Sequence, residues 1–210
     1  MTVSEAKQWN RRELIGGIAL LAAAIGVPAA VVSLSALSAD DAPTDRQRAI
    51  ITAASQHVIP RTATPGAGDV GVGDFVILAL AHGLDGTRAP SGAAGMPQLA
   101  RFQRPDGSLR FLDWLEDALD ARGRSDWLAR KPAEQSAALA RLDAEAFAQG
   151  ADKHPWRALK ALILTGYYTS QAGGSRELRY VLDPGRFDPD LPLAPHTPAF
   201  SSDWSAVDFG

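Results

Sequence analysis

Cysteine is missing from this chain of 210 residues. Without it the chain forms no disulfide, no thiolate metal site, no cysteine-bound iron–sulfur cluster and no CxxCH haem attachment. The four histidines show none of the HxH, HxxH or HExxH spacings of metal sites, so no metal is expected. A GxSxG nucleophile elbow is also missing, which leaves a serine hydrolase unsupported. These absences predict a chain with no active site and no cofactor of its own.

An excess of positive charge is missing as well, because the net charge is −3 at pH 7. A mildly acidic surface argues against nucleic acid or anionic lipid as the main partner. One glycine-rich segment, GAGDVG at residues 66–71, matches the dinucleotide fingerprint G-x-G-x-x-G. That fingerprint requires a preceding β-strand, whereas a helical pattern and Pro60 come before it here. We therefore expect Gly66 and Gly68 to shape a turn and Gly71 to begin a helix.

The most prominent feature that is present lies near the start of the chain. Arg11 and Arg12 shortly precede the segment from Leu14 to Leu37, which contains no charged residue. A basic region, an apolar run and then small residues form the pattern of a twin-arginine export signal. Residues 1–38 are thus expected to direct the chain to the periplasm by the twin-arginine route. That route carries proteins that have already folded, usually because they hold a cofactor.

The same stretch has a second interpretation as a membrane helix, since about 20 apolar residues span a bilayer. Glycine, proline and serine residues dilute its hydrophobicity, which favours an export signal over a permanent anchor. Ala36 and Ser38 stand at positions −3 and −1 of a potential cut before Ala39. Two outcomes stay open at this point: a cleaved leader, or an uncut one that holds the chain at the cytoplasmic membrane.

Residues 39–180 show apolar side chains at helical spacing, separated by proline and glycine. No run of alternating β-branched residues is long enough to predict a strand. The expected fold class is therefore all-α, with one compact domain of about five to six helices behind the signal helix. Ser108 is expected as an N-cap and Phe147 as an inward-facing residue. The predicted helices cover residues 44–59, 72–84, 108–119, 132–147 and 155–167.

The last segment, residues 181–210, is rich in proline, aspartate and aromatic residues. Prolines at this density prevent a helix, so we expect an extended tail. Its composition alone fits a disordered tail. The alternative is an extended strap whose spaced aromatic side chains, such as Trp204, bind in a partner's grooves.

Several short blocks of this chain form a recognisable series: IPRTATPGA at 59–67, GVGDF at 71–75, GYYTS at 166–170, ELRY at 177–180 and PGRF at 184–187. In this order they resemble the gluconate 2-dehydrogenase subunit 3 family, over roughly residues 45–193. Two departures are Ala63, where an acidic residue is expected, and Gly71-Val72, which follow Val70 rather than alanine.

The resemblance implies an accessory role. Members look like small subunits of periplasmic, membrane-associated sugar dehydrogenases, without an active site. The implied partner is a flavin-bearing large subunit of the glucose–methanol–choline (GMC) oxidoreductase type, which holds FAD and carries out the hydride chemistry. A c-type cytochrome subunit with haem c is often the electron acceptor. The small subunit then supplies the signal read by the twin-arginine translocase and stabilises the folded partner.

From this role we expect residues 167–187 and the tail to form the interface with the partner. Tyr167 and Tyr168 lie about 100° apart on a helix, so one should pack inward and the other should face a partner. The nearby arginines either pair with carboxylates of the large subunit or merely cap this domain's own surface. The predicted interface residues are Tyr167, Tyr168, Arg176, Arg179, Tyr180, Arg186, Phe187 and Trp204.

Two other functions stay open on the sequence alone. An independent periplasmic enzyme would turn over a substrate as a single purified chain, and a membrane-tethered scaffold would keep its leader. The sugar or sugar acid that such a complex oxidises is not readable here, because the partner's pocket would select it.

Overall fold

The computed structural model describes residues 37–90, 97–123 and 126–180, together with residues 190, 192, 194 and 197–201. The predicted export arginines and part of the predicted interface lie outside the described residues. Within them, no helix is long and apolar enough to cross a membrane. The predicted residues that fall outside are Arg11, Arg12, Arg186, Phe187 and Trp204.

The described part of the chain is mostly helical, which confirms the all-α prediction. Three short helical turns and one pair of very short parallel strands join the main helices. The α-helices are α2 (Asp45–Val58), α3 (Val72–His82), α4 (Phe111–Gly123), α5 (Pro132–Ala146) and α6 (Pro155–Tyr168). The turns are η3 (Leu84–Gly86), η5 (Pro97–Phe102) and η6 (Gly173–Glu177), and the strands are β1 (Leu178–Tyr180) and β2 (Ala199–Ser201).

Local capping explains where α2 begins and where α3 begins and ends. The Thr44 hydroxyl accepts from the Gln47 backbone N–H at 3.1 Å, and the Gln47 side chain accepts from the Thr44 N–H at 3.0 Å. This reciprocal pair satisfies donors that the first turn of α2 cannot use internally. Gly71 and Gly83 flank α3 with φ angles of 80° and 74°, a left-handed conformation that favours glycine.

Two local predictions are wrong. Ser108 does not cap α4, which begins at Phe111; its hydroxyl instead donates to Asp106 at 2.6 Å inside the preceding turn. Short polar side chains often make such local bonds in place of a helix cap. Phe147 does not face the core, because α5 has already ended at Ala146 and the ring is 50% exposed.

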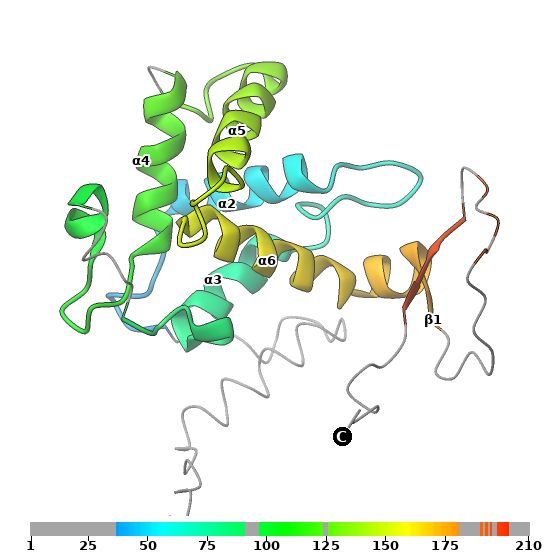
Figure 1. Ribbon diagram of the computed structural model, residues 1–210, viewed down its shortest axis with the longest axis horizontal. Coiled ribbons are helices and arrows are strands. Elements are labelled where there is room, and N and C mark those ends of the chain that lie inside the picture. Colours follow the sequence, from blue (N-terminus) through cyan, green and yellow to red (C-terminus); the bar gives the residue numbers. More distant parts are fainter. Residues whose placement is uncertain are drawn as a thin grey trace, which may run out of the picture.

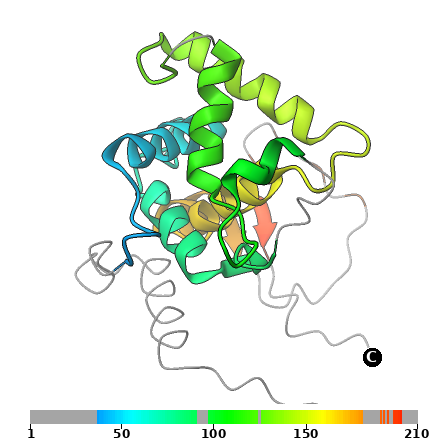
Figure 2. The same ribbon diagram turned by 90° about the vertical axis from the view of Figure 1, so that its left-hand side faces the viewer.

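Helix α6 lies at the centre of the domain and packs against α2, α3, α4 and α5. Figure 1 shows α6 crossing the molecule, with α3 on one side of it and α4 and α5 on the other. In the perpendicular view of Figure 2, α4 stands upright and α5 slopes away from its upper end. The core between these helices includes the fully buried rings of Trp127, Trp156 and Tyr167. Helix α6 also contacts η6, which follows it in the chain.

Candidate functional site

Segments far apart in the sequence meet at the C-terminal end of α6. The loop between α2 and α3 reaches the same end of the molecule as η6 and β1, on the right of Figure 1. We call this contact region the motif junction and define it as residues 59–71, 166–168 and 173–180. It unites four of the blocks that carry the family resemblance, although more than a hundred residues separate the first from the last.

Tyr167 is the central side chain of the motif junction. Its ring is fully buried, and its hydroxyl lies 3.0 Å from the Pro65 carbonyl oxygen and 3.3 Å from Glu177 Oε1. Glu177 Oε1 also accepts a hydrogen bond from the Thr64 hydroxyl. Burial, which disfavours the phenolate, raises the pKa of Tyr167 above its ordinary value. The hydroxyl therefore stays protonated and links α6 to both the loop and η6.

Glycine makes the close packing of the motif junction possible. A Cβ atom on Gly166 would lie 2.5 Å from Cδ1 of the buried Phe75 ring, and one on Gly66 would lie 2.5 Å from the Gln56 side-chain amide. A Cβ on Gly173 would overlap the Tyr167 carbonyl oxygen. Real side chains do not tolerate such distances, so these positions require glycine as long as the backbone stays where it is.

The loop side of the junction is held by Asp69. Its carboxylate accepts from the Gly66 backbone N–H at 2.8 Å and from Gln56 at 3.3 Å, and it pairs with Arg61 at 2.8 Å. The Gly66 hydrogen bond is the main cause that lowers the pKa of this carboxyl. The G-x-G-x-x-G match thus lies in a turn that follows a helix, and Gly71 begins α3 as the sequence predicts.

A row of apolar and basic side chains runs along α6 away from the junction and reaches Phe147, which follows α5. We call it the α6 stripe and define it as Phe147, Arg157, Lys160, Leu164 and Tyr168. Leu164 and Tyr168 lie one turn apart and are 37% and 39% exposed. Arg157 and Lys160 cover the Phe147 ring at 4.6 and 4.8 Å from its centroid. The stripe therefore combines apolar surface with two cations at one end.

The stripe is continuous with the motif junction through the two neighbouring tyrosines. The Tyr168 ring packs edge-on against the Tyr167 ring, with 5.3 Å between centroids and 80° between planes. As their helical angle predicts, Tyr167 is buried and Tyr168 faces outward. A partner that covers Tyr168 would thus contact the junction indirectly.

The other predicted interface residues with described positions lie nearby. Arg176 is exposed on η6, and Arg179 is exposed on β1, which pairs in parallel with β2. Tyr180 ends β1. This strand pairing was not predicted, because three residues are too few to show an alternating pattern.

Sequence reasoning missed Thr64, Glu177 and Leu164. Thr64 and Glu177 lie inside the resemblance blocks, which was a usable signal, but nothing in either block shows that the two side chains meet. Leu164 had a signal of its own, since it falls four residues before Tyr168 and opposite the buried side of α6.

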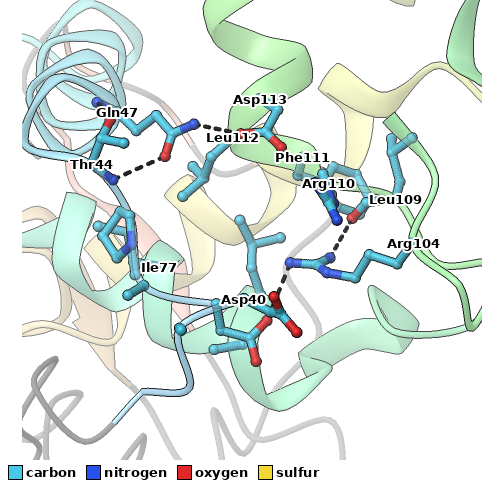
Figure 3. A pocket seen from close by; sticks show the side chains of 16 residues that line it. Asp40, Thr44, Gln47, Ile77, Arg104, Leu109, Arg110, Phe111, Leu112 and Asp113 are labelled. Atoms are coloured by element: carbon cyan, nitrogen blue, oxygen red, sulfur yellow. Dashed lines mark hydrogen bonds and ion pairs between the residues drawn. The ribbon is translucent and has the colours of Figure 1, made fainter. Parts of the chain in front are cut away.

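Some of the polar groups that line the two pockets are paired with neighbouring polar groups. A pocket of about 230 Å³ lies between the segment before α2 and the start of α4 (Figure 3). In it, Gln47 donates to Asp113 at 2.5 Å and Arg104 donates to the Leu109 carbonyl at 2.8 Å. A second pocket of about 220 Å³ contains His57, whose Nε2 lies 3.0 Å from Gln135 Oε1. The second pocket is also lined by Ser136, Asp143 and Lys160.

A metal-binding group is not found either in the part of the chain that the structure describes: no three His, Asp or Glu side chains there are placed to hold an ion. His154 instead caps α6, with its Nδ1 accepting from the Trp156 N–H at 3.3 Å.

Comparison with known proteins agrees with the blocks described above. The family model for gluconate 2-dehydrogenase subunit 3 matches residues 45–185. No curated protein and no solved structure shows significant similarity. The matched range includes the whole motif junction and the α6 stripe. Since it also spans most of the chain, the protein belongs to the gluconate 2-dehydrogenase subunit 3 family.

Proposed function

We propose that this protein is the non-catalytic small subunit of a periplasmic, flavin-dependent sugar or sugar-acid dehydrogenase. It carries the twin-arginine signal for a GMC-type large subunit that holds FAD, and it stabilises that subunit by binding it. The main observation in support is the motif junction: four of the five blocks that carry the family resemblance gather in one place, beside the partly exposed side chains of Leu164 and Tyr168. Exposed apolar and aromatic side chains beside such a junction are a suitable surface for a partner protein.

The composition of the α6 stripe indicates what the partner surface should look like. Leu164 and Tyr168 provide an apolar and aromatic centre, which is where protein interfaces gain most of their free energy. Arg157 and Lys160 lie at one end of the stripe, and Arg176 is exposed beyond the other. The large subunit should therefore present an apolar patch between carboxylates, since opposite charges at the rim orient a complex.

In this proposal the work is divided between chains. The large subunit binds FAD and the sugar and performs the hydride transfer, and a c-type cytochrome subunit with haem c receives the electrons. The small chain contributes Arg11 and Arg12 to the translocase and a folded surface to the large subunit. The leader of this small chain, which has no cofactor motif, then exports a large subunit that does contain a cofactor.

The export part of the proposal is tested by co-expression with a candidate flavoprotein subunit encoded beside it. With the full chain, the flavoprotein should reach the periplasm and co-purify with the small subunit, with a visible flavin spectrum and sugar-dependent dye reduction. With Arg11 and Arg12 both changed to Lys, it should stay in the cytoplasm. Export of the flavoprotein in the absence of a functional leader on this chain would rule the proposal out.

The binding part is tested on the α6 stripe. Leu164→Asp places a charge at the centre of the predicted interface, and an interface hot spot of about 2 kcal/mol corresponds to a roughly thirtyfold weaker complex. Thr165→Asp is the matched control, because Thr165 is the exposed next residue of the same helix and points about 100° away. Equal co-purification of both variants with the flavoprotein would show that the stripe is not the interface.

A further inference from the structure

The segment that connects the leader to the domain is docked on the domain. Leu37 packs against the hydrophobic core. The Ser38 carbonyl oxygen accepts hydrogen bonds from the backbone N–H groups of Asp41 and Ala42, both at 2.9 Å. The Ser38 hydroxyl donates to Asp41 Oδ2 at 2.8 Å. Residues 38–42 therefore form a hydrogen-bonded turn that begins at the carbonyl of Ser38.

Two arginines hold this turn in place, and we call the arrangement the Asp41 clamp. Asp41 Oδ1 accepts from Arg88 at 2.5 Å and from Arg104 at 3.2 Å. The Asp41 and Arg104 side chains are only 13% and 16% exposed, so water competes weakly for them. Arg104 donates in turn to the Leu109 carbonyl oxygen, and Arg88 Nε donates to the Ala81 carbonyl oxygen near the end of α3 at 3.4 Å.

The clamp acts on the bond at which the leader would be removed. Ala36 and Ser38 occupy the −3 and −1 positions of a cut before Ala39. A signal peptidase would have to attack the Ser38 carbonyl carbon, and peptides that are bound by an enzyme groove are usually extended strands. Here the oxygen of that carbonyl is already bound by two backbone donors of the turn. The peptidase and the folded domain thus require different conformations of the same residues.

We propose that the Ser38–Ala39 bond is a masked processing site: the folded domain holds it in a turn that signal peptidase cannot bind, so the leader stays attached and tethers the chain to the membrane. The inference rests on the proposed function in one respect, export in the folded state, because the Asp41 clamp then forms before the peptidase meets the bond. Cleavage of a masked bond requires local opening and is proportional to the open population.

The test uses the full chain, co-expressed with its flavoprotein partner, and measures the intact mass of the exported small subunit and its distribution between membrane and soluble fractions. The native chain should keep residues 1–38 and stay with the membrane. Asp41→Ala should open the turn and yield about tenfold or more of a soluble chain that starts at Ala39. Asp74→Ala is the matched control, because it removes the Arg48–Asp74 ion pair elsewhere on the surface.

A second variant keeps the clamp intact in case Asp41→Ala does not fold. A short Gly-Ser insertion between Ala39 and Asp40 moves the bond out of the turn without touching Asp41, and it should also permit cleavage. A native chain that starts at Ala39 would overturn the inference, as would two folded variants that both remain uncut. Either result leaves the proposed function standing as long as the flavoprotein is exported, whereas a flavoprotein retained in the cytoplasm contradicts the proposed function alone.

Discussion

The two ends of this domain are held together by different interactions. At the motif junction, contacts involve backbone atoms, glycines and the buried hydroxyl of Tyr167. At the opposite end, charged side chains on the surface join the helices: Arg46 in the first turn of α2 pairs with Glu116, Asp120 and Asp126. Four of the five resemblance blocks contribute to the first end, where close packing makes stability sensitive to the addition of a single atom.

This difference in chemistry implies that the two ends tolerate amino-acid substitutions differently. Overpacking a close backbone contact costs about 1–3 kcal/mol, whereas an exposed ion pair contributes about 0–1 kcal/mol. A charged contact also survives conservative replacement, since many geometries satisfy it. We therefore expect substitutions at the junction to be several times more destabilising than those among the surface arginines.

The largest effect is expected at Gly166, inside α6. Helix propensity alone predicts that Gly166→Ala stabilises the protein by about 1 kcal/mol. The new Cβ would, however, lie 2.5 Å from the Phe75 ring, which is buried and has little room to move. We expect a net loss of about 2 kcal/mol in the free energy of unfolding, and a larger loss for Gly166→Val. Urea unfolding decides the sign, and a stabilised Gly166→Ala would show that the junction is loosely packed.

A smaller loss is expected when only the hydroxyl of Tyr167 is removed. Tyr167→Phe leaves the Pro65 carbonyl and Glu177 without this donor in a buried site, at a cost of about 1–2 kcal/mol. The neighbour provides the control: Tyr168→Phe should change stability by less than about 0.5 kcal/mol, since its ring is partly in water. Equal effects in thermal unfolding would contradict the assignment of Tyr167 as the link.

Substitution at the charged end should lower stability less, and the loss should depend on the salt concentration. Arg46→Ala removes a cation that is 32% exposed and leaves three carboxylates near one another. We expect a loss of about 1 kcal/mol at low ionic strength that shrinks in roughly 1 M salt, where the Debye length falls to about 3 Å. A loss that does not depend on salt would mean that Arg46 acts through packing, as the junction residues do.

The same comparison explains which parts of the structure the sequence predicts. Helical spacing and the prolines and glycines at helix ends predict each α-helix of the described residues to within a few residues, because these signals are local. The packing of Tyr167 inward and Tyr168 outward follows from an angle on one helix. The Thr64–Glu177 contact does not follow, since it depends on how α2 and α6 pack, and no local pattern encodes that distance.

Both wrong predictions arise from the same limit. Ser108 is a suitable N-cap by type, but Asp106 lies close enough to bind it first. Phe147 fits the apolar side of α5 by spacing, but the helix ends one residue before it. The residue types fit in both cases, but one prediction missed a neighbouring hydrogen-bond acceptor and the other placed the end of a helix one residue too late.

The smallest expected effect concerns the N-terminal end of α6, which His154 caps. Its Nδ1 accepts from the Trp156 N–H at 3.3 Å, and its ring packs edge-on against Trp114 at 5.5 Å. Accepting that bond requires an unprotonated Nδ1. Burial, and next the positive charge of Arg122, lower the pKa of His154 from its ordinary value of 6.5. The folded state thus favours the neutral imidazole, while the unfolded chain binds a proton more readily.

This depressed pKa gives the pH dependence a definite sign. The contribution of His154 to stability is fully present above pH 6.5, the ordinary pKa, and is lost as pH falls through the lower pKa of the folded state. His154→Asn keeps a side-chain acceptor at the N-cap but does not titrate, so it should flatten the fall in melting temperature below that pH. His154→Ala should flatten it equally while lowering stability at every pH, since it also removes the cap. If His154→Asn retains the native pH dependence of the melting temperature, another titrating group governs that dependence. The two ends of α6 would then differ in their packing but not in how their stability depends on pH.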